Sequence, residues 1–296
     1  MERKLKDYLM LSLKGIGMGA ADVVPGVSGG TIAFIVGIYD ELIDSIKSIN
    51  GNSLKLFFTG KWKAFWKAVN GNFLFFLLAG IAVSILSLAK LITWLLVAHP
   101  ILVWAFFFGL VLASTWFVGK DIKEWNWKTI LGFILGGVIA FYITIATPAE
   151  TSENLLFIFV CGAIAICAMI LPGISGSFIL VLLGKYFFIM EAVKTFDIKI
   201  IAIFGLGAVI GITTFSRVLS FALKHFRNIT LAVLTGFMLG SLNKVWPWKE
   251  LADNSHGIPI EVNVAPNQSI IEAVVLMVVG FFLVVFLEKL SAKAEK

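Results

Sequence analysis

The residues best suited to chemistry in this sequence form two copies of a Pro-Gly-x-Ser-Gly motif. The first copy is Pro25-Gly26-Val27-Ser28-Gly29, and the second is Pro172-Gly173-Ile174-Ser175-Gly176. Proline removes a backbone donor and glycine permits a sharp bend, so each Pro-Gly pair predicts a break in a helix. Serine after such a break favours an N-cap for the next helix, which predicts Ser28 and Ser175 as caps.

The helix that follows each break would begin with free backbone N–H groups. Such groups and the helix dipole together bind anions, so two of these ends facing each other would form a phosphate- or carboxylate-sized site without a metal. The alternative is a pair of structural kinks that let helices pack closely. The residues predicted to bind the anion are Ser28, Gly29, Gly30, Thr31, Ser175, Gly176 and Ser177.

One acidic residue lies close to the first motif. Asp22 precedes Pro25 by three positions, and the equivalent residue before the second motif is Met169. Acidic residues within membranes are usually functional, which makes Asp22 the candidate for binding a coupling proton or sodium ion. The alternative is an interfacial or capping carboxylate.

Basic residues could balance a bound anion. Arg217 lies inside a long apolar segment, and its guanidinium is suited to phosphate. The alternative for Arg217 is a side chain that extends to the inner interface beside Lys224. Lys14 and Lys90 are weaker candidates for these charged roles.

The elements around these residues belong to a membrane protein. The chain has 296 residues, of which 59% are hydrophobic and 14% charged, whereas soluble domains contain about 45–50% and about 25%. Its charge-free runs approach or exceed the roughly 17–25 residues that a membrane-spanning helix needs. These runs are 73–89, 91–119, 129–149, 154–184, 200–216, 228–243 and 273–287. The composition therefore predicts an all-α polytopic membrane protein.

The two motifs are part of an internal repeat. Residues 25–39 match 172–186 at an offset of 147, with seven of fifteen positions identical. Residues 108–115 match 235–242 at an offset of 127. The difference between the offsets indicates extra residues in the first half.

This repeat divides the single membrane domain into two halves. The first repeat is 1–147, with a cytoplasmic insertion at about 50–72, and the second is 148–296. Each half is predicted to contain one returning hairpin and three spans, near 9–49, 73–97, 100–118 and 129–147, then 154–190, 199–222, 229–243 and 270–287. Because three is odd, the second half would enter from the opposite side, as in inverted-repeat transporters with a midplane substrate site. The alternative is a duplication retained only as scaffold.

The hairpin tips are predicted to stop inside the membrane. The charge-free run 154–184 would be about 46 Å long as one helix, against a bilayer core of about 30 Å. Pro172-Gly173 lies at its middle, which favours a re-entrant hairpin. A hairpin of two full spans remains an alternative, because both return to the same side.

The basic residues predict the orientation. Most Lys and Arg fall on one side, and the positive-inside rule makes that side cytoplasmic, with both termini there. The net charge of +6 then reflects topology and not nucleic-acid binding. The predicted external side carries Lys185, Lys194, Lys199, Lys244 and Lys249.

Two smaller features bear on partners and cofactors. Leu54–Lys67 is basic with interleaved aromatics, which fits an amphipathic helix on the anionic inner leaflet or, alternatively, a solvated basic loop. Cys161 and Cys167 suit small buried hydrophobic positions. No His, Cys or acidic cluster indicates a metal or a cofactor, and enzyme chemistry is not expected. A homo-oligomer is neither indicated nor excluded.

The motif residues resemble a known family. The run from Gly15 to Thr31 resembles the N-terminal signature of the PopT polyprenyl-phosphate transporters of bacteria and archaea, formerly a domain of unknown function. Leu171 to Phe178 resembles the second signature of that family. Ser216-Arg217, Gly240-Ser241-Leu242 and Trp246-Pro247-Trp248 are also similar to family positions.

The resemblance implies a flippase in the bacterial or archaeal plasma membrane. Such a protein would return undecaprenyl phosphate from the outer to the cytoplasmic leaflet, so that the lipid carrier is reused in cell-wall and surface-polymer synthesis. Its partners would be this lipid and the surrounding membrane lipids. The alternative function is an ion-coupled transporter or channel for a small soluble anion, which would require a site closed to lipid.

Overall fold

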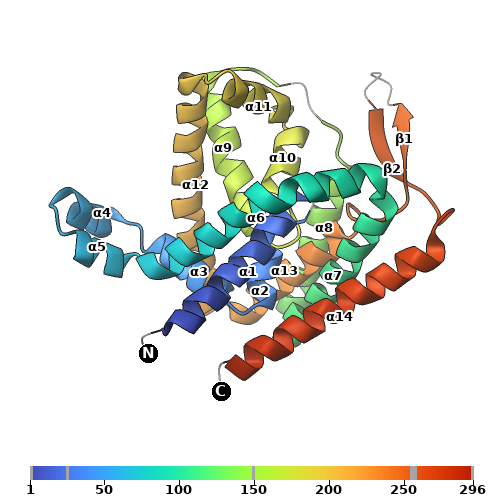
Figure 1. Cartoon of the computed structure of the whole chain (residues 1–296), viewed down its shortest axis with the longest axis horizontal. Coiled ribbons are helices and arrows are strands. Elements are labelled where there is room, and N and C mark those ends of the chain that lie inside the picture. The colour runs from blue at the N-terminus through green and yellow to red at the C-terminus, as the bar shows by residue number, and fades with distance from the viewer. Residues whose placement is uncertain (1–2, 25–26, 149–150, 254–258, 295–296) are drawn as a thin grey trace. The chain divides into compact units, whose positions relative to one another are not determined.

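The computed structural model describes residues 3–24, 27–148, 151–253 and 259–294. Within these ranges the chain forms fourteen helices and one two-stranded sheet, which confirms an essentially all-helical protein (Figure 1). The elements are α1 Leu5–Val23, α2 Gly29–Ile35, α3 Tyr39–Lys47, α4 Gly51–Phe58, α5 Trp62–Ala68, α6 Gly71–Ala98, α7 Pro100–Lys120, α8 Trp127–Ile145, α9 Leu155–Ile170, α10 Gly176–Leu182, α11 Tyr186–Lys194, α12 Ile198–His225, α13 Arg227–Ser241, β1 Lys249–Asp253, β2 Pro259–Asn263 and α14 Ile270–Ala294.

Five described helices are long and apolar enough to cross a membrane, namely α6, α7, α8, α12 and α14. In α6, α12 and α14 only 17% of the most apolar window is buried inside the protein. The remaining apolar surface requires lipid to cover it. The chain is therefore a multi-pass membrane protein, and these five helices lie where spans were predicted.

The sixth predicted span, 229–243, corresponds to the shorter helix α13. With 15 residues it is about 22 Å long, which is less than the bilayer core of about 30 Å. The bent pair α10 and α11 also has the combined length and composition of one span.

The bounds of the elements repeat along the chain at the offsets of the sequence repeat. At the offset that relates the two motifs, α2 and α3 coincide with α10 and α11, and the last residue of α1 coincides with that of α9. At the smaller offset of the later segments, α6 coincides with α12. The same pattern of helices therefore occurs in both halves, with α4 and α5 as the extra elements of the first.

Equivalent helix pairs also pack through equivalent glycines. Gly15 on α1 and Gly80 on α6 each lie so close to the other helix that a Cβ would overlap its backbone carbonyl oxygen. Gly162 on α9 and Gly207 on α12 form the same arrangement. Small residues allow helix backbones to approach closely in membranes, where packing rather than the hydrophobic effect drives association.

The described contacts group the chain into two compact units, and each unit draws on both halves. Unit 1 comprises Met1–Ala89 and Pro148–Arg227, and unit 2 comprises Lys90–Thr147 and Asn228–Lys296. Both helix breaks lie in unit 1. There α9 packs along α12, and α3 lies against the same helix. In unit 2, α7 packs along α14.

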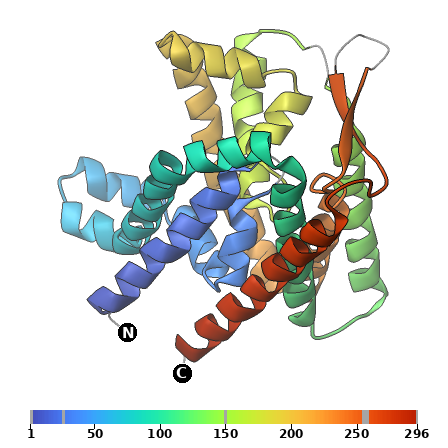
Figure 2. The same ribbon diagram turned by 45° about the vertical axis from the view of Figure 1, so that its right-hand side comes forward.

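The β-hairpin in unit 2 was not predicted, because the stretch between the last two helices was expected to be an external loop. β1 pairs antiparallel with β2 (Figure 2). Trp246 and Trp248 precede β1, and their indole N–H groups donate to the carbonyl oxygens of Val264 and Gln268, each at 2.9 Å. These two bonds hold the ends of the hairpin together.

Candidate substrate site at the two helix breaks

The first break separates α1 from α2. Pro25 and Gly26 lie outside the described residues. Ser28 is the N-cap of α2, because its Oγ accepts a hydrogen bond from the backbone N–H of Gly30 at 3.0 Å. The predicted cap is therefore confirmed at this break, and Ser28 is fully buried.

A carboxylate occupies the start of α2. The backbone N–H of Gly29 donates to Oδ1 of Asp22 at 2.7 Å. The side chain is half-buried at the end of α1, so Asp22 acts as a cap on the helix that follows. This contact corresponds to the capping role that the sequence left open as an alternative for Asp22. The carboxylate lies where a bound anion was predicted.

The second break separates α9 from α10 and is organised differently. Pro172 and Gly173 are buried in the turn, where Gly173 has a φ of +92°, a conformation that glycine adopts readily. Ser175 occupies the predicted N-cap position of α10, but its side chain makes no capping hydrogen bond. Its Oγ pairs with Oγ of Ser177 at 2.7 Å. Met169 supplies no carboxylate here.

The two breaks contact each other although a long stretch of sequence separates them. Oγ of Ser28 donates to the carbonyl oxygen of Met169 at 2.8 Å. The hydroxyl of Tyr39 donates to the carbonyl oxygen of Ile170 at 3.2 Å, and the backbone N–H of Gly173 donates to Oγ1 of Thr31 at 3.1 Å. Carbonyl oxygens at a helix end lack intrahelical donors, so the first break supplies the partners that the end of α9 needs.

The helices after the breaks are short. α2 and α10 have seven residues each, or about 10 Å, so neither crosses a bilayer core of about 30 Å. α10 and α11 meet at a bend of 111°. Each predicted hairpin therefore contains three helices instead of two. The short return arms favour re-entrant tips over full spans.

No contact between described residues places Arg217 at either break. Its side chain is exposed on α12, and it makes no hydrogen bond or ion pair with the described part of the chain. Lys90 is also exposed, and it occupies the position on α6 that corresponds to Arg217 at the offset of 127. Both halves therefore carry a cation at the same place on their first long helix.

Two other predicted charges have structural partners. Nζ of Lys14 donates to the carbonyl oxygen of Val36 at 2.6 Å, at the C-terminal end of α2. Nζ of Lys224 contacts the carboxylate of Asp44 at 2.8 Å. Lys14 thus stabilises the helix that follows the first break, because cations favour helix C-termini.

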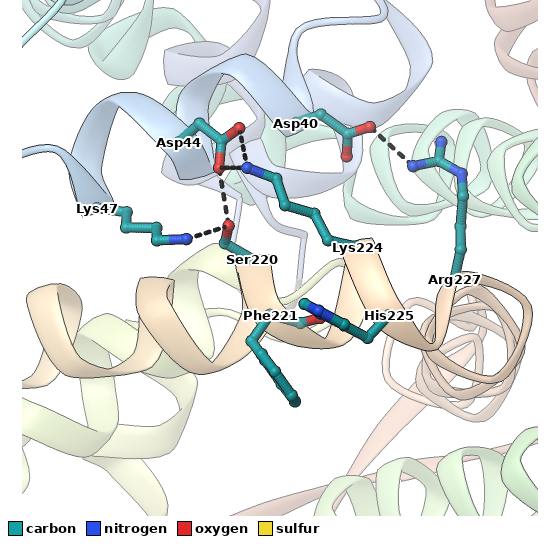
Figure 3. A network of polar contacts seen from close by, with 8 residues as sticks. All are labelled: Asp40, Asp44, Lys47, Ser220, Phe221, Lys224, His225 and Arg227. Carbon is teal, nitrogen blue, oxygen red and sulfur yellow. Dashed lines mark hydrogen bonds and ion pairs between the residues drawn. The ribbon is translucent and has the colours of Figure 1, made fainter.

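A polar network that the sequence did not reveal ties α3 to the end of α12 (Figure 3). Asp44 on α3 accepts from Lys224 and from Oγ of Ser220, both at 2.8 Å. Asp40, one turn earlier, pairs with Arg227 at 2.9 Å. The spacing of the two aspartates places them on one face of α3, but their partners come from the other half of the sequence and leave no local signal.

A second missed cluster surrounds Lys249 in unit 2. Its Nζ lies 3.8 Å from the centroid of the Trp104 ring and donates to the carbonyl oxygen of Lys244 at 2.8 Å. Burial lowers the pKa of Lys249 to about 8, although the nearby charge of Glu261 acts in the opposite direction. The cluster fastens the hairpin to α7.

The described residues contain no group of three or more His, Cys, Asp or Glu side chains that could hold a metal ion. The described cysteines are free thiols, with Cys161 buried and Cys167 partly exposed. The polar groups at the breaks are hydroxyls, backbone N–H groups and one carboxylate. This set can bind an anion and a small cation.

Comparison with known proteins extends these observations to the whole chain. Residues 18–258 match the sequence family described as undecaprenyl phosphate translocase-like. A polyprenyl-phosphate transporter from Vibrio cholerae is 47% identical, over 99% of this chain and 100% of that protein. A polyprenyl-phosphate transporter from Staphylococcus aureus is 30% identical, over 96% and 97% of the two chains. No solved structure matches the chain.

Proposed function

The chain belongs to the undecaprenyl phosphate translocase-like family, and on this basis we propose that it returns undecaprenyl phosphate, or a related polyprenyl phosphate, to the cytoplasmic leaflet. The resemblance found in the motifs is thereby confirmed. The family and both relatives are named as transporters and not as enzymes, and the chain is a transporter of polyprenyl phosphate. The direction, the recycling of the lipid carrier and the ion coupling are the further parts of the proposal.

The observation that carries the proposal is the contact between the two breaks. Three hydrogen bonds reach the backbone of the second break, one from Ser28, one to Thr31 on α2 and one from Tyr39 on α3. This contact places Ser28 and Thr31 against Met169 and Gly173, a few residues before Ser175 and Ser177 in the chain. Hydroxyls and helix N–H groups are suitable donors for phosphate oxygens. We assign the headgroup to this neighbourhood, while the prenyl tail stays in lipid.

The donors of the two breaks would contribute unequally. The N–H of Gly29 is already bonded to Asp22, and that of Gly30 to Ser28. The second break has no such carboxylate, so Gly176 and the hydroxyls of Ser175 and Ser177 are the first candidates to meet the phosphate. Gly29, Gly30 and Thr31 would also bind the phosphate once Asp22 moves away or is neutralised.

Asp22 would couple headgroup binding to a cation. A carboxylate and a phosphate about 4 Å apart repel each other by about 4 kcal/mol at an effective dielectric constant of 20. A proton or a sodium ion on Asp22 removes this repulsion. Substrate binding and cation binding would then favour each other, which is the thermodynamic basis of ion-coupled transport.

Arg217 would attract the headgroup from outside the breaks. It is exposed on α12, and a guanidinium can form two hydrogen bonds with a phosphate. Lys90 occupies the equivalent position on α6. In an inverted repeat, these two cations would serve the two sides of the membrane in turn.

The proposed topology places both termini in the cytoplasm and relates the halves by inversion. Support comes from the matching bounds of the elements and from the odd number of spans predicted after each hairpin. Cysteine-accessibility labelling at Lys123, predicted cytoplasmic, and at Leu251, predicted external, tests this orientation. Labelling of both positions from the same side contradicts it.

The function is tested with purified protein in sealed vesicles that contain undecaprenyl phosphate. Transport predicts that lipid in the outer leaflet becomes protected from an added impermeant phosphatase faster with the protein than without it. Inorganic phosphate inside separate vesicles tests the alternative of a soluble-anion transporter. Release of phosphate without lipid movement supports that alternative, and movement of neither anion contradicts the assignment.

A further inference from the structure

The insertion in the first half forms a helical hairpin of its own. α4 and α5 are two short helices joined at Thr59–Lys61, so the single amphipathic helix considered for 54–67 is wrong. In Figures 1 and 2 the two helices lie beside the N-terminal end of α6, apart from α9 and α12. The second half has no counterpart. The hairpin is therefore not needed for the repeated fold.

The base of the hairpin fixes its depth. The Trp66 ring lies against Gly71, where a Cβ would overlap the indole, and its Nε1 donates to Oδ1 of Asn72 at 2.7 Å. Gly71 is the first residue of α6, a membrane-spanning helix. Because α5 is held within one turn of that helix end, the hairpin lies at the boundary between the bilayer and water.

The hairpin is strongly basic. Residues 51–70 contain four lysines and no Asp or Glu. Lys55, Lys61, Lys63 and Lys67 are all exposed, and none pairs with an acidic side chain in the described part of the chain. By contrast, Lys224 near the end of α12 and Arg227 at the start of α13 each pair with an aspartate. The charge of the hairpin is thus available to an external anion.

Aromatic side chains are exposed among these lysines. Phe57 contacts Phe58, Trp62 and Phe65 with ring centroids 4.6–5.5 Å apart, which joins the two helices. Phe58 is nevertheless 80% exposed and Trp62 60% exposed. Large aromatic rings beside lysines at the membrane boundary are typical of segments that insert into the headgroup layer.

We propose that α4 and α5 bind the anionic phospholipid headgroups of the leaflet in which α6 begins. Phe58 and Trp62 insert between the headgroups, and the four lysines contact the phosphates. Phosphatidylglycerol and cardiolipin are the appropriate chemistry, because separated cations with exposed rings between them match a layer of anionic headgroups. This binding surface is distinct from the breaks and does not depend on the proposed transport.

The hairpin is linked to the first break through its last residue. Nδ2 of Asn70 donates to Oε1 of Glu41 at 2.9 Å and to Oγ of Ser45 at 3.0 Å, both on α3. Arg3 pairs with the same Glu41. Lipid binding at the hairpin therefore acts on a segment that is anchored to α3, the second helix after the first break.

The test uses the full-length protein with an environment-sensitive fluorophore on Phe58→Cys, in a Cys161→Ala, Cys167→Ala background. The protein is reconstituted without any polyprenyl phosphate, in phosphatidylcholine alone or with phosphatidylglycerol added. We expect a blue shift of the emission only with phosphatidylglycerol, and its loss at high salt, because salt screens surface charge. The same probe on Leu251→Cys in β1 should show no such shift.

The charge contribution is tested with Lys55→Gln, Lys61→Gln, Lys63→Gln and Lys67→Gln combined. Each lysine near an anionic surface contributes about fivefold, so we expect the amount of phosphatidylglycerol needed for the shift to rise by roughly tenfold or more. The matched control replaces the exposed Lys123, Lys128, Lys194 and Lys199 by Gln and should leave the shift unchanged. If the quadruple variant does not fold, Lys61→Gln with Lys63→Gln gives the same comparison with a smaller effect.

Three outcomes overturn the proposal. The first is a probe at position 58 that reports the same environment in both lipid mixtures. The second is an equal effect of the hairpin variant and of its matched control. The third comes from separate phosphatidylcholine vesicles to which undecaprenyl phosphate is added: a shift there, with none in phosphatidylglycerol, would make the hairpin part of the substrate path. Transport activity does not enter these measurements, so a failed transport assay leaves them intact.

Discussion

The two helix breaks share the Pro-Gly-x-Ser-Gly sequence and a following helix of seven residues, yet their hydrogen bonds differ. In the first break, Asp22 and Ser28 cap the new helix, and Ser28, Thr31 and Tyr39 bond to the second break. In the second break, the hydroxyls of Ser175 and Ser177 bond only to each other among the described residues.

This difference shows that one motif can serve two tasks in the same fold. The first break supports its neighbour, whereas the headgroup contacts that we propose fall mainly to the second. The residue that separates the two tasks is outside the motif, at the end of the preceding helix, where Asp22 corresponds to Met169. Substitutions at these positions should therefore affect the two breaks differently.

Giving the second break its own carboxylate should have the largest effect. In Met169→Asp, the new carboxylate lies at the N-terminal end of α10 and repels a phosphate there. A repulsion of about 4 kcal/mol would decrease transport by at least about 100-fold. Vesicle transport of undecaprenyl phosphate measures it. Met169→Asn is the neutral control of the same size, and equal loss in both variants would mean that shape and not charge is responsible.

The cations at equivalent positions of α12 and α6, Arg217 and Lys90, give the next test. Arg217→Ala should decrease transport about 10-fold or more while the protein still inserts in the membrane, because a charge-assisted bond to phosphate contributes about 1.5–3 kcal/mol. Arg217→Lys should restore part of it. Lys90→Ala should have a smaller effect, because an ammonium lacks the bidentate geometry. Normal transport by Arg217→Ala would leave this side chain a role at the interface only.

Removing the charge of the first break should change the dependence on cations more than the rate. In Asp22→Asn, Oδ1 still accepts from Gly29, so the cap persists while protonation and sodium binding are lost. The wild-type protein should transport faster as the pH falls or as sodium rises, and the variant should respond to neither. Asp40→Asn, at an exposed ion pair, is the control that should keep the wild-type profile. A profile for Asp22→Asn that matches the wild type would restrict Asp22 to capping.

The free energy of unfolding should also differ between substitutions at the two breaks, but by a smaller amount. Ser28→Ala removes a cap and a hydrogen bond to Met169, which together contribute about 2 kcal/mol. Ser175→Ala removes no capping bond and should cost less than about 1 kcal/mol, although it should slow transport. Thermal unfolding in detergent compares the two. Equal shifts of the midpoint would show that the serines are structurally equivalent after all.

Much of the fold follows from local signals in the sequence. Both short helices begin one position after the serine of each motif, because proline, glycine and serine act on the adjacent backbone. The long helices overlap the charge-free runs, although α6 and α12 extend beyond them to include Lys90 and Arg217. The offset of 147 between the motifs recurs in the bounds of the helices around them.

The contacts that define the candidate site are less predictable. Ser28 was recognised as a cap, but its bond to Met169 joins residues 141 positions apart, and no spacing encodes it. Ser175 occupies the N-cap position without a capping bond, and its hydroxyl pairs with that of Ser177, a contact that the motif does not predict. The β-hairpin was missed because its strands are short and polar, and its ends depend on two tryptophans that contact distant carbonyls.

The interlocked glycines of the α1–α6 and α9–α12 pairs have a mechanical consequence. A glycine facing a carbonyl fixes the register of the two helices, because sliding one helix by less than a full turn would bring a bulkier residue against that oxygen. Each helix pair therefore moves as a rigid unit. A conformational change must then bend the chain where these pairs end. The C-terminal ends of α1 and α9 lie at the two breaks, so such a change would alter the geometry of the candidate substrate site.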